Sequence, residues 1–155
     1  MQPCQRVGTR YIVHSLFLAC SVCNEGVGMN AVAAAVSFNL LICVVIIFQL
    51  ALAAGAPWGQ VAMGGKYPGR FPRQLRIAAV IQALVLVGLG AIVLARAGLL
   101  FPQWQAAANW LIWGVVAFSA LSLVLNLITP SHWERILWAP VAAGLLLCSV
   151  AVALA

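Results

Sequence analysis

Four long apolar stretches constrain this chain more than any other feature. They run over about 31–54, 77–94, 107–129 and 137–155. Each is close to the roughly 20 residues that a helix needs to cross ~30 Å of hydrocarbon. In lipid, backbone amides must be bonded within their own segment, and these stretches are too continuous for barrel strands. The predicted fold class is therefore all-α: a transmembrane four-helix bundle over residues 29–155.

The composition excludes a water-soluble domain. Of the 155 residues, 65% are hydrophobic and only 6% are charged, whereas about a quarter of an average soluble domain is charged. The net charge of +6 is read as a membrane-topology signal and not as a nucleic-acid-binding surface, because basic residues flank membrane spans on the cytoplasmic side.

The basic residues are divided unequally between the connections. Connections 55–76 and 130–136 together hold five Lys and Arg, against Arg96 alone in connection 95–106. The positive-inside bias places the first two connections in the cytoplasm and both ends of the bundle outside. We expect a multi-pass protein of the cell membrane, with a belt of aromatic residues at the span boundaries: Trp58, Tyr67, Phe71, Phe101, Trp104, Trp110, Trp133 and Trp138.

Residues 1–28 do not fit the bundle pattern. Their apolar run YIVHSLFLACSVC is too short to span a bilayer, and Arg6 and Arg10 precede it, as in a signal peptide. The three interpretations are a translation start at Met29, a signal sequence, and a peripheral extension. The Cys20–Cys23 pair lacks the second ligand pair or βαβ context of a metal or redox motif.

The basic connection GAPWGQVAMGGKYPGRFPRQLR is not a phosphate-binding P-loop. No strand precedes it, and no Ser or Thr follows Lys66. Its glycines permit tight turns, so it is expected to form a folded cap on the cytoplasmic mouth of the bundle. Its cations can hold anionic headgroups at ~1 kcal/mol each. The candidate lipid or partner contacts at this mouth are Lys66, Arg70, Arg73, Arg76, Glu134 and Arg135.

The short turn before the fourth stretch carries the other polar cluster. Ser131 and Glu134 have the spacing of a helix capping box. We expect Glu134 to form an ion pair with one cation of the basic connection, which would order that connection. The chain has no Asp, only two acidic residues and no dense set of metal ligands. These absences argue against paired-carboxylate catalysis, a catalytic triad, a metal site and a cofactor, so no enzyme is predicted.

Several polar residues lie within the apolar stretches. Ser119, Ser122 and Asn126 share one face of the third helix, Gln82 lies on the second, and Asn39 and Gln49 lie on the first. Small and weakly polar residues of this kind commonly form helix–helix contacts in lipid. The alternative is a polar pocket between the helices that faces the basic connection. No Asp, Glu, Lys or His lies deep in a stretch, so the usual marker of an ion pathway is absent.

Two segments carry a family resemblance: GAPWGQVAMGGKYPGRFPRQLR before an apolar helix, and NLITPSHWERILWAPVA. In these the chain resembles a group of small uncharacterised bacterial membrane proteins with four helices. The resemblance covers about residues 29–155. It implies an architecture and a bacterial inner membrane, but no activity.

Two functional classes remain. The first is a scaffold or accessory membrane protein that binds lipid or a membrane partner through its helix faces and basic connection. The second is a small transporter or export component, which would be oligomeric because four short helices enclose little volume. A polar cavity with access from one side would favour transport.

Overall fold

The computed structural model describes residues 31–67 and 69–155. The described chain contains four long helices and no strand: α2 (Ala31–Ala54), α3 (Arg73–Arg96), α4 (Gln105–Ile128) and α5 (His132–Leu154). Three short 3₁₀ turns accompany them: η1 (Gly59–Val61), η2 (Met63–Gly65) and η3 (Pro102–Trp104). All four long helices are long and apolar enough to cross a membrane, which confirms the all-α four-helix fold. The expectations for residues 1–28, including the Cys20–Cys23 pair, lie outside the described residues.

Two helices begin earlier than their apolar stretches. α3 starts at Arg73 and α5 at His132, whereas hydropathy places these starts near 77 and 137. Hydropathy marks where the core of the bilayer begins, but a helix continues into the headgroup region as long as its backbone bonds are made. The polar first turns of α3 and α5 are therefore helical, and Arg73 and Arg76 belong to α3 and not to the loop.

The C-terminal end of α2 shows why the chain turns at Gly55. The amide of Gly55 donates to the carbonyl of Leu52 and the amide of Ala56 donates to that of Ala51, which is the bond pattern of a Schellman motif. Gly55 has a φ of +97°, a conformation that glycine adopts without the steric cost of a Cβ. The Arg76 Nε donates to the Ala53 carbonyl at 2.7 Å, so one cation satisfies another terminal carbonyl of α2.

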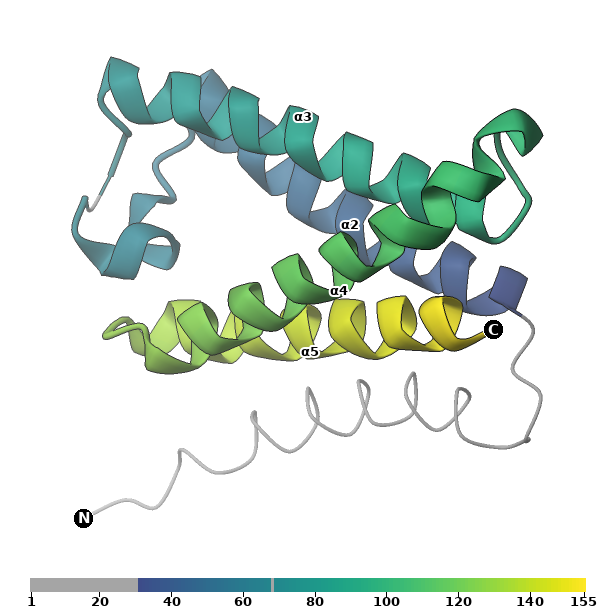
Figure 1. Ribbon diagram of the computed structural model, residues 1–155. Coiled ribbons are helices and arrows are strands. Elements are labelled where there is room, and N and C mark those ends of the chain that lie inside the picture. The colour runs from purple at the N-terminus through teal and green to yellow at the C-terminus, as the bar shows by residue number, and fades with distance from the viewer. Residues whose placement is uncertain (1–30, 68) are drawn as a thin grey trace, which may run out of the picture.

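The four long helices form two antiparallel hairpins, α2–α3 and α4–α5 (Figure 1). α2 also packs on α5, whereas α3 and α5 make little contact. α3 and α4 come together at one end of the bundle and diverge toward the other, where η1 and η2 lie (Figure 1). We call the end with η1, η2 and the α4–α5 turn the loop end, and the opposite end the sealed end. The C-terminus lies at the sealed end (Figure 1).

The buried core is concentrated in the middle of the bundle and toward the sealed end. Ala34, Ala35, Val93, Ile112 and Val115 have at most 1% of their surface exposed. Elsewhere the helices expose their apolar side chains: between 17% and 33% of the most apolar window of each span is buried. Such extensive apolar exposure is what lipid-facing surfaces require, whereas in water it would promote aggregation.

α2 and α3 approach closely where Asn39 meets Gly90. The Asn39 Nδ2 donates to the carbonyl of Ala35 at 2.9 Å and to that of Gly90 at 3.4 Å. A Cβ at Gly90 would lie 2.6 Å from the Asn39 Oδ1, so the contact requires glycine. Close approach at a small residue, joined by a polar side chain, is a common mode of helix association in membranes.

Candidate functional site

The basic loop folds into a plug, which we define as residues 58–67 and 69–71. Its turns depend on Gly59, whose amide donates to the carbonyl of Gly69 at 3.1 Å. A Cβ at Gly59 would lie 2.1 Å from the Tyr67 carbonyl oxygen, so no other residue fits there without moving the backbone. Phe71, the last residue of the plug, is buried with Leu52 of α2 and Ala79 of α3. The plug is therefore a packed element anchored to α2 and α3.

Three side chains of the α4–α5 turn and α5 hold the plug. The Glu134 Oε2 accepts the Gly64 amide at 2.7 Å, the Ser131 hydroxyl donates to the Gln60 carbonyl at 3.2 Å, and the Trp138 Nε1 donates to the Val61 carbonyl at 2.9 Å. All three use backbone groups of η1 and η2 that the short turns leave unpaired. The predicted meeting of the basic loop with the 131–135 turn is thus observed.

The prediction that Glu134 forms an ion pair with a cation of the loop is wrong, because no such pair occurs among the described residues. Instead, the Glu134 Oε2 accepts hydrogen bonds from the Gly64 amide and, at 2.9 Å, from the Thr129 hydroxyl. Gly64 has a φ of +70°, which turns its amide toward α5. The predicted cap is half observed: the Glu134 amide donates to the Ser131 hydroxyl at 3.3 Å, while the Glu134 carboxylate reaches the plug instead of closing the capping box.

The basic candidates fall into two groups. Arg76 bonds the Ala53 carbonyl, and Arg135 bonds the Thr129 carbonyl at 2.6 Å, so both cations lie at helix C-termini, where the helix dipole favours positive charge. Lys66, Arg70 and Arg73 are exposed at the loop end and make no hydrogen bond or ion pair within the described ranges. The Lys66 Nζ lies 5.9 Å from the ring centroid of Tyr67.

Beneath the plug lies a cavity of about 410 Å³ lined by residues of all four long helices. Its inner wall is mostly apolar and includes Phe38, Ile42, Leu86 and Leu145. A second hollow of about 810 Å³ shares Met63, Gln82, Phe118, Ser122, Leu125, Asn126 and Glu134 with it. This second hollow lies between α3, α4 and η2, where α3 and α4 diverge. It continues onto Leu121 and Ile128, which are exposed on α4, so the cavity has an opening at the side of the bundle.

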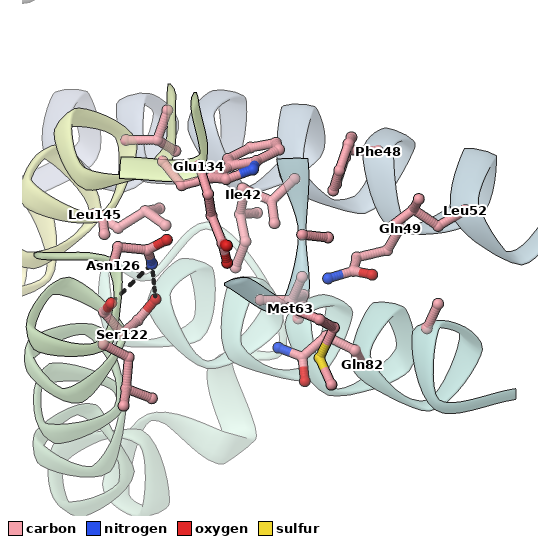
Figure 2. Close-up of a pocket in the computed structure, with 18 of the residues that line it drawn as sticks. Ile42, Phe48, Gln49, Leu52, Met63, Gln82, Ser122, Asn126, Glu134 and Leu145 are labelled. Atoms are coloured by element: carbon pink, nitrogen blue, oxygen red, sulfur yellow. Dashed lines mark hydrogen bonds between the residues drawn. The ribbon is translucent and has the colours of Figure 1, made fainter. Parts of the chain in front are cut away.

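Polar side chains from every helix reach this cavity. Gln49 comes from α2, Gln82 from α3, Ser122 and Asn126 from α4, and Glu134 from α5 (Figure 2). The carboxamides of Gln49 and Gln82 extend into the space in which the Glu134 carboxylate lies (Figure 2). Neither carboxamide hydrogen-bonds to another described residue. The Asn126 Nδ2 donates to the Ser122 carbonyl at 2.8 Å and to its hydroxyl at 3.5 Å, and the Asn126 Oδ1 accepts no hydrogen bond from the described residues.

The structure thus brings together the four polar candidates of the helices. Gln82, Ser119, Ser122 and Asn126 all line the cavity, in the arrangement of the polar-pocket interpretation. Of these only Ser119 is fully buried. The small residues Ala83 and Gly90 are buried on α3 and do not line the cavity, as helix packing requires. Helix–helix packing therefore accounts for these small residues, and the polar-pocket interpretation accounts for the polar residues that line the cavity.

Trp138 and Phe71 are residues whose roles sequence reasoning misplaced. Both were expected in the aromatic belt, but Phe71 is buried. The Trp138 ring packs on Phe48 at 4.5 Å between centroids, and its indole bonds the plug. Trp104, Trp110 and Trp133 do face outward, with more than 60% of their surface exposed. Trp138 lies one helical turn after Glu134 and therefore on the same face of α5. This spacing indicates that Trp138 also faces the plug.

Among the described residues no group of three or more His, Cys, Asp or Glu side chains is placed to hold a metal ion. The polar groups of the cavity are suited to hydrogen bonding with a ligand. Comparison with protein-family models, curated proteins and solved structures finds no match for this chain.

Proposed function

We propose that this protein is an accessory membrane protein that holds the headgroup of a lipid in the cavity beneath the plug. The observation that carries the proposal is the cavity itself. About 410 Å³ of space within the bundle combines an apolar inner wall with polar groups near the plug. Ligand sites typically combine apolar walls with a few placed polar groups, and a lipid headgroup presents polar atoms that such groups can bond.

The side opening supports entry from the bilayer. Leu121, Leu125 and Ile128 line the opening and are 56%, 53% and 68% exposed. Acyl chains that lie on these residues would remain in the lipid phase while the headgroup enters between α3 and α4. The ligand would therefore need no passage through water.

Further contacts with the membrane come from the exposed cations of the loop end. Lys66, Arg70 and Arg73 are positioned to attract anionic headgroups, at ~1 kcal/mol each near a charged surface. The positive-inside bias makes this end the cytoplasmic one, in the bacterial inner membrane that the family resemblance implies. The exposed helix faces leave room for a second copy or for another membrane protein.

A transport or export component is the second candidate. It is favoured by the one-sided form of the cavity, which is closed toward the sealed end by the core around Ala35, Val93 and Val115. Alternating access would require this core to open. Solute or lipid flux in proteoliposomes separates the two classes, because an accessory protein gives no flux above that of protein-free vesicles.

Native mass spectrometry of the protein released from lipid nanodiscs tests the proposed cavity. Wild-type protein should retain one lipid per chain. Ser122→Phe, which fills the cavity, should lose it, whereas Val124→Phe, on the exposed face of the same helix, should keep it. Equal retention by both variants would contradict the proposal.

A further inference from the structure

We infer that the cavity selects a headgroup with a primary ammonium beside a phosphate, as in phosphatidylethanolamine; this inference rests on the proposed function. The inference comes from the charges and the free hydrogen-bond acceptors around the cavity and its opening.

Among the described residues that line the cavity, Glu134 is the only ionisable one. Its Oε2 takes both hydrogen bonds, from Gly64 and Thr129, and the Oε1 accepts none from the described residues. Both donors are uncharged, so they do not compensate the negative charge of a carboxylate. An anionic group beside it would be repelled, whereas a cation would be stabilised, because a charge out of water requires a partner. The part of the ligand that lies beside Glu134 is therefore cationic.

The remaining polar atoms favour a cation with several N–H donors. The Asn126 Nδ2 is engaged with Ser122, so its Oδ1 is the available atom. The carboxamides of Gln49 and Gln82 reach the same space (Figure 2) and can each present a carbonyl oxygen. A primary ammonium has three donors and can bond the carboxylate and two of these carbonyls at once. A quaternary trimethylammonium has none.

The opening adds a positive charge on the outer side of Glu134. Lys66 lines the outer hollow together with Glu134, and the Lys66 ammonium is exposed. A phosphate one ethanolamine unit away from the ammonium would lie toward Lys66, and lysine binds phosphate as a point charge. The acyl chains would follow Leu121 and Leu125 into the bilayer. Each part of a phosphatidylethanolamine molecule thus meets a surface of complementary chemistry.

The experiment is a headgroup series with identical acyl chains. Wild-type protein is presented in nanodiscs with phosphatidylethanolamine, its N,N-dimethyl derivative, phosphatidylcholine or phosphatidylglycerol, and the retained lipid is measured by native mass spectrometry. Methylation removes donors while the positive charge stays. One charge-assisted hydrogen bond is worth enough for about a tenfold change in affinity. Retention should therefore fall at each methylation step, and phosphatidylglycerol should be retained least.

A variant comparison assigns the preference to the cavity. Gln49→Leu combined with Gln82→Leu should reduce the preference for phosphatidylethanolamine over phosphatidylcholine. Gln105→Leu, at the exposed start of α4 near the sealed end, should leave it unchanged. The wild-type ranking of the four lipids does not depend on the folding of any variant.

The outcomes separate this inference from the proposed function. If wild-type protein retains all four lipids equally and Ser122→Phe loses them, the cavity binds lipid without selecting the amine. This result would overturn the inference but not the proposed function. If Ser122→Phe retains every lipid as wild type does, the cavity is not a lipid site and both proposals fail. Preferred retention of phosphatidylglycerol would also overturn the inference.

Discussion

The Glu134 carboxylate accepts a 2.7 Å hydrogen bond from the amide of Gly64, a residue 70 positions earlier in the chain. The bond joins the start of α5 to the middle of the basic plug. It forms because Gly64 adopts a left-handed conformation that turns its amide outward and because Glu134 projects from the first turn of α5. The same carboxylate lines the cavity, so one residue both holds the plug and faces the proposed ligand.

Removing this carboxylate should loosen the plug. Glu134→Ala deprives the Gly64 amide and the Thr129 hydroxyl of their acceptor, and hydrogen bonds to charged groups contribute about 1.5–3 kcal/mol. Limited trypsin digestion of protein in nanodiscs should cleave after Lys66 and Arg70 about tenfold faster than in wild type. Glu134→Gln, which keeps an acceptor oxygen without the charge, should fall between the two.

The matched control is His132→Ala. This residue is exposed in the same turn and makes no hydrogen bond to the plug in the described chain. Its cleavage rate should equal that of wild type. Cleavage of Glu134→Ala at the His132→Ala rate would mean that the Glu134 contact does not order the plug.

Trp138→Phe should weaken the plug by a smaller amount. The substitution removes the indole bond to the Val61 carbonyl but retains an aromatic ring against Phe48. The lost neutral hydrogen bond is worth about 1 kcal/mol, which predicts a roughly fivefold rise in cleavage after Lys66. Trp133→Phe, at an exposed ring, is the control and should have no effect; an equal rise in both variants would assign the change to general destabilisation.

Two glycines of α3 should respond in opposite ways to alanine. A Cβ at Gly90 would lie 2.6 Å from the Asn39 Oδ1, so Gly90→Ala must displace Asn39 and should cost about 1–3 kcal/mol. At Gly88 a Cβ meets nothing within 4 Å, and Gly88→Ala should be neutral or stabilise by about 0.5–1 kcal/mol. Thermal unfolding in detergent, followed by circular dichroism, compares the two variants.

A double mutant tests the cause of the Gly90 effect. In the Asn39→Ala background the displaced side chain is absent, so Gly90→Ala should cost less than it does alone, with a coupling above about 0.5 kcal/mol. Strictly additive effects would show that the contact between Asn39 and Gly90 does not explain the need for glycine.

The charge distribution predicts the orientation in the membrane. Single cysteines in the plug and at Ala155 are placed in a background without other cysteines and probed with an impermeant thiol reagent. The terminal cysteine should react in intact cells, and the plug cysteine only after permeabilisation. Labelling of the plug in intact cells with protection of the terminus would reverse the assigned topology.

Hydropathy alone predicts the four helices, because lipid allows few alternatives for a long apolar segment. The fold of the plug was not predictable in the same way. It depends on the close approach of Gly59 to the Tyr67 carbonyl and on the left-handed turn at Gly64. Because of this turn, the partner of Glu134 is the backbone amide of Gly64, whereas the distribution of charges in the sequence predicts a Lys or Arg side chain. The polar residues of the helices were recognised as a group. Whether Gln82 and Asn126 face a neighbour or a cavity depends on the divergence of α3 and α4 at the plug, which no local pattern encodes.

The most direct test of the proposed lipid site is its location by photo-crosslinking. A phospholipid with a photoreactive group near its headgroup is incorporated with the protein in nanodiscs, and the adducts are mapped by peptide mass spectrometry. We expect adducts concentrated on α3 around Gln82 and on α4 from Ser122 to Asn126, and their loss in Ser122→Phe but not in Val124→Phe. Adducts spread evenly over exposed residues such as Trp110 and Leu147, and unchanged by Ser122→Phe, would contradict it.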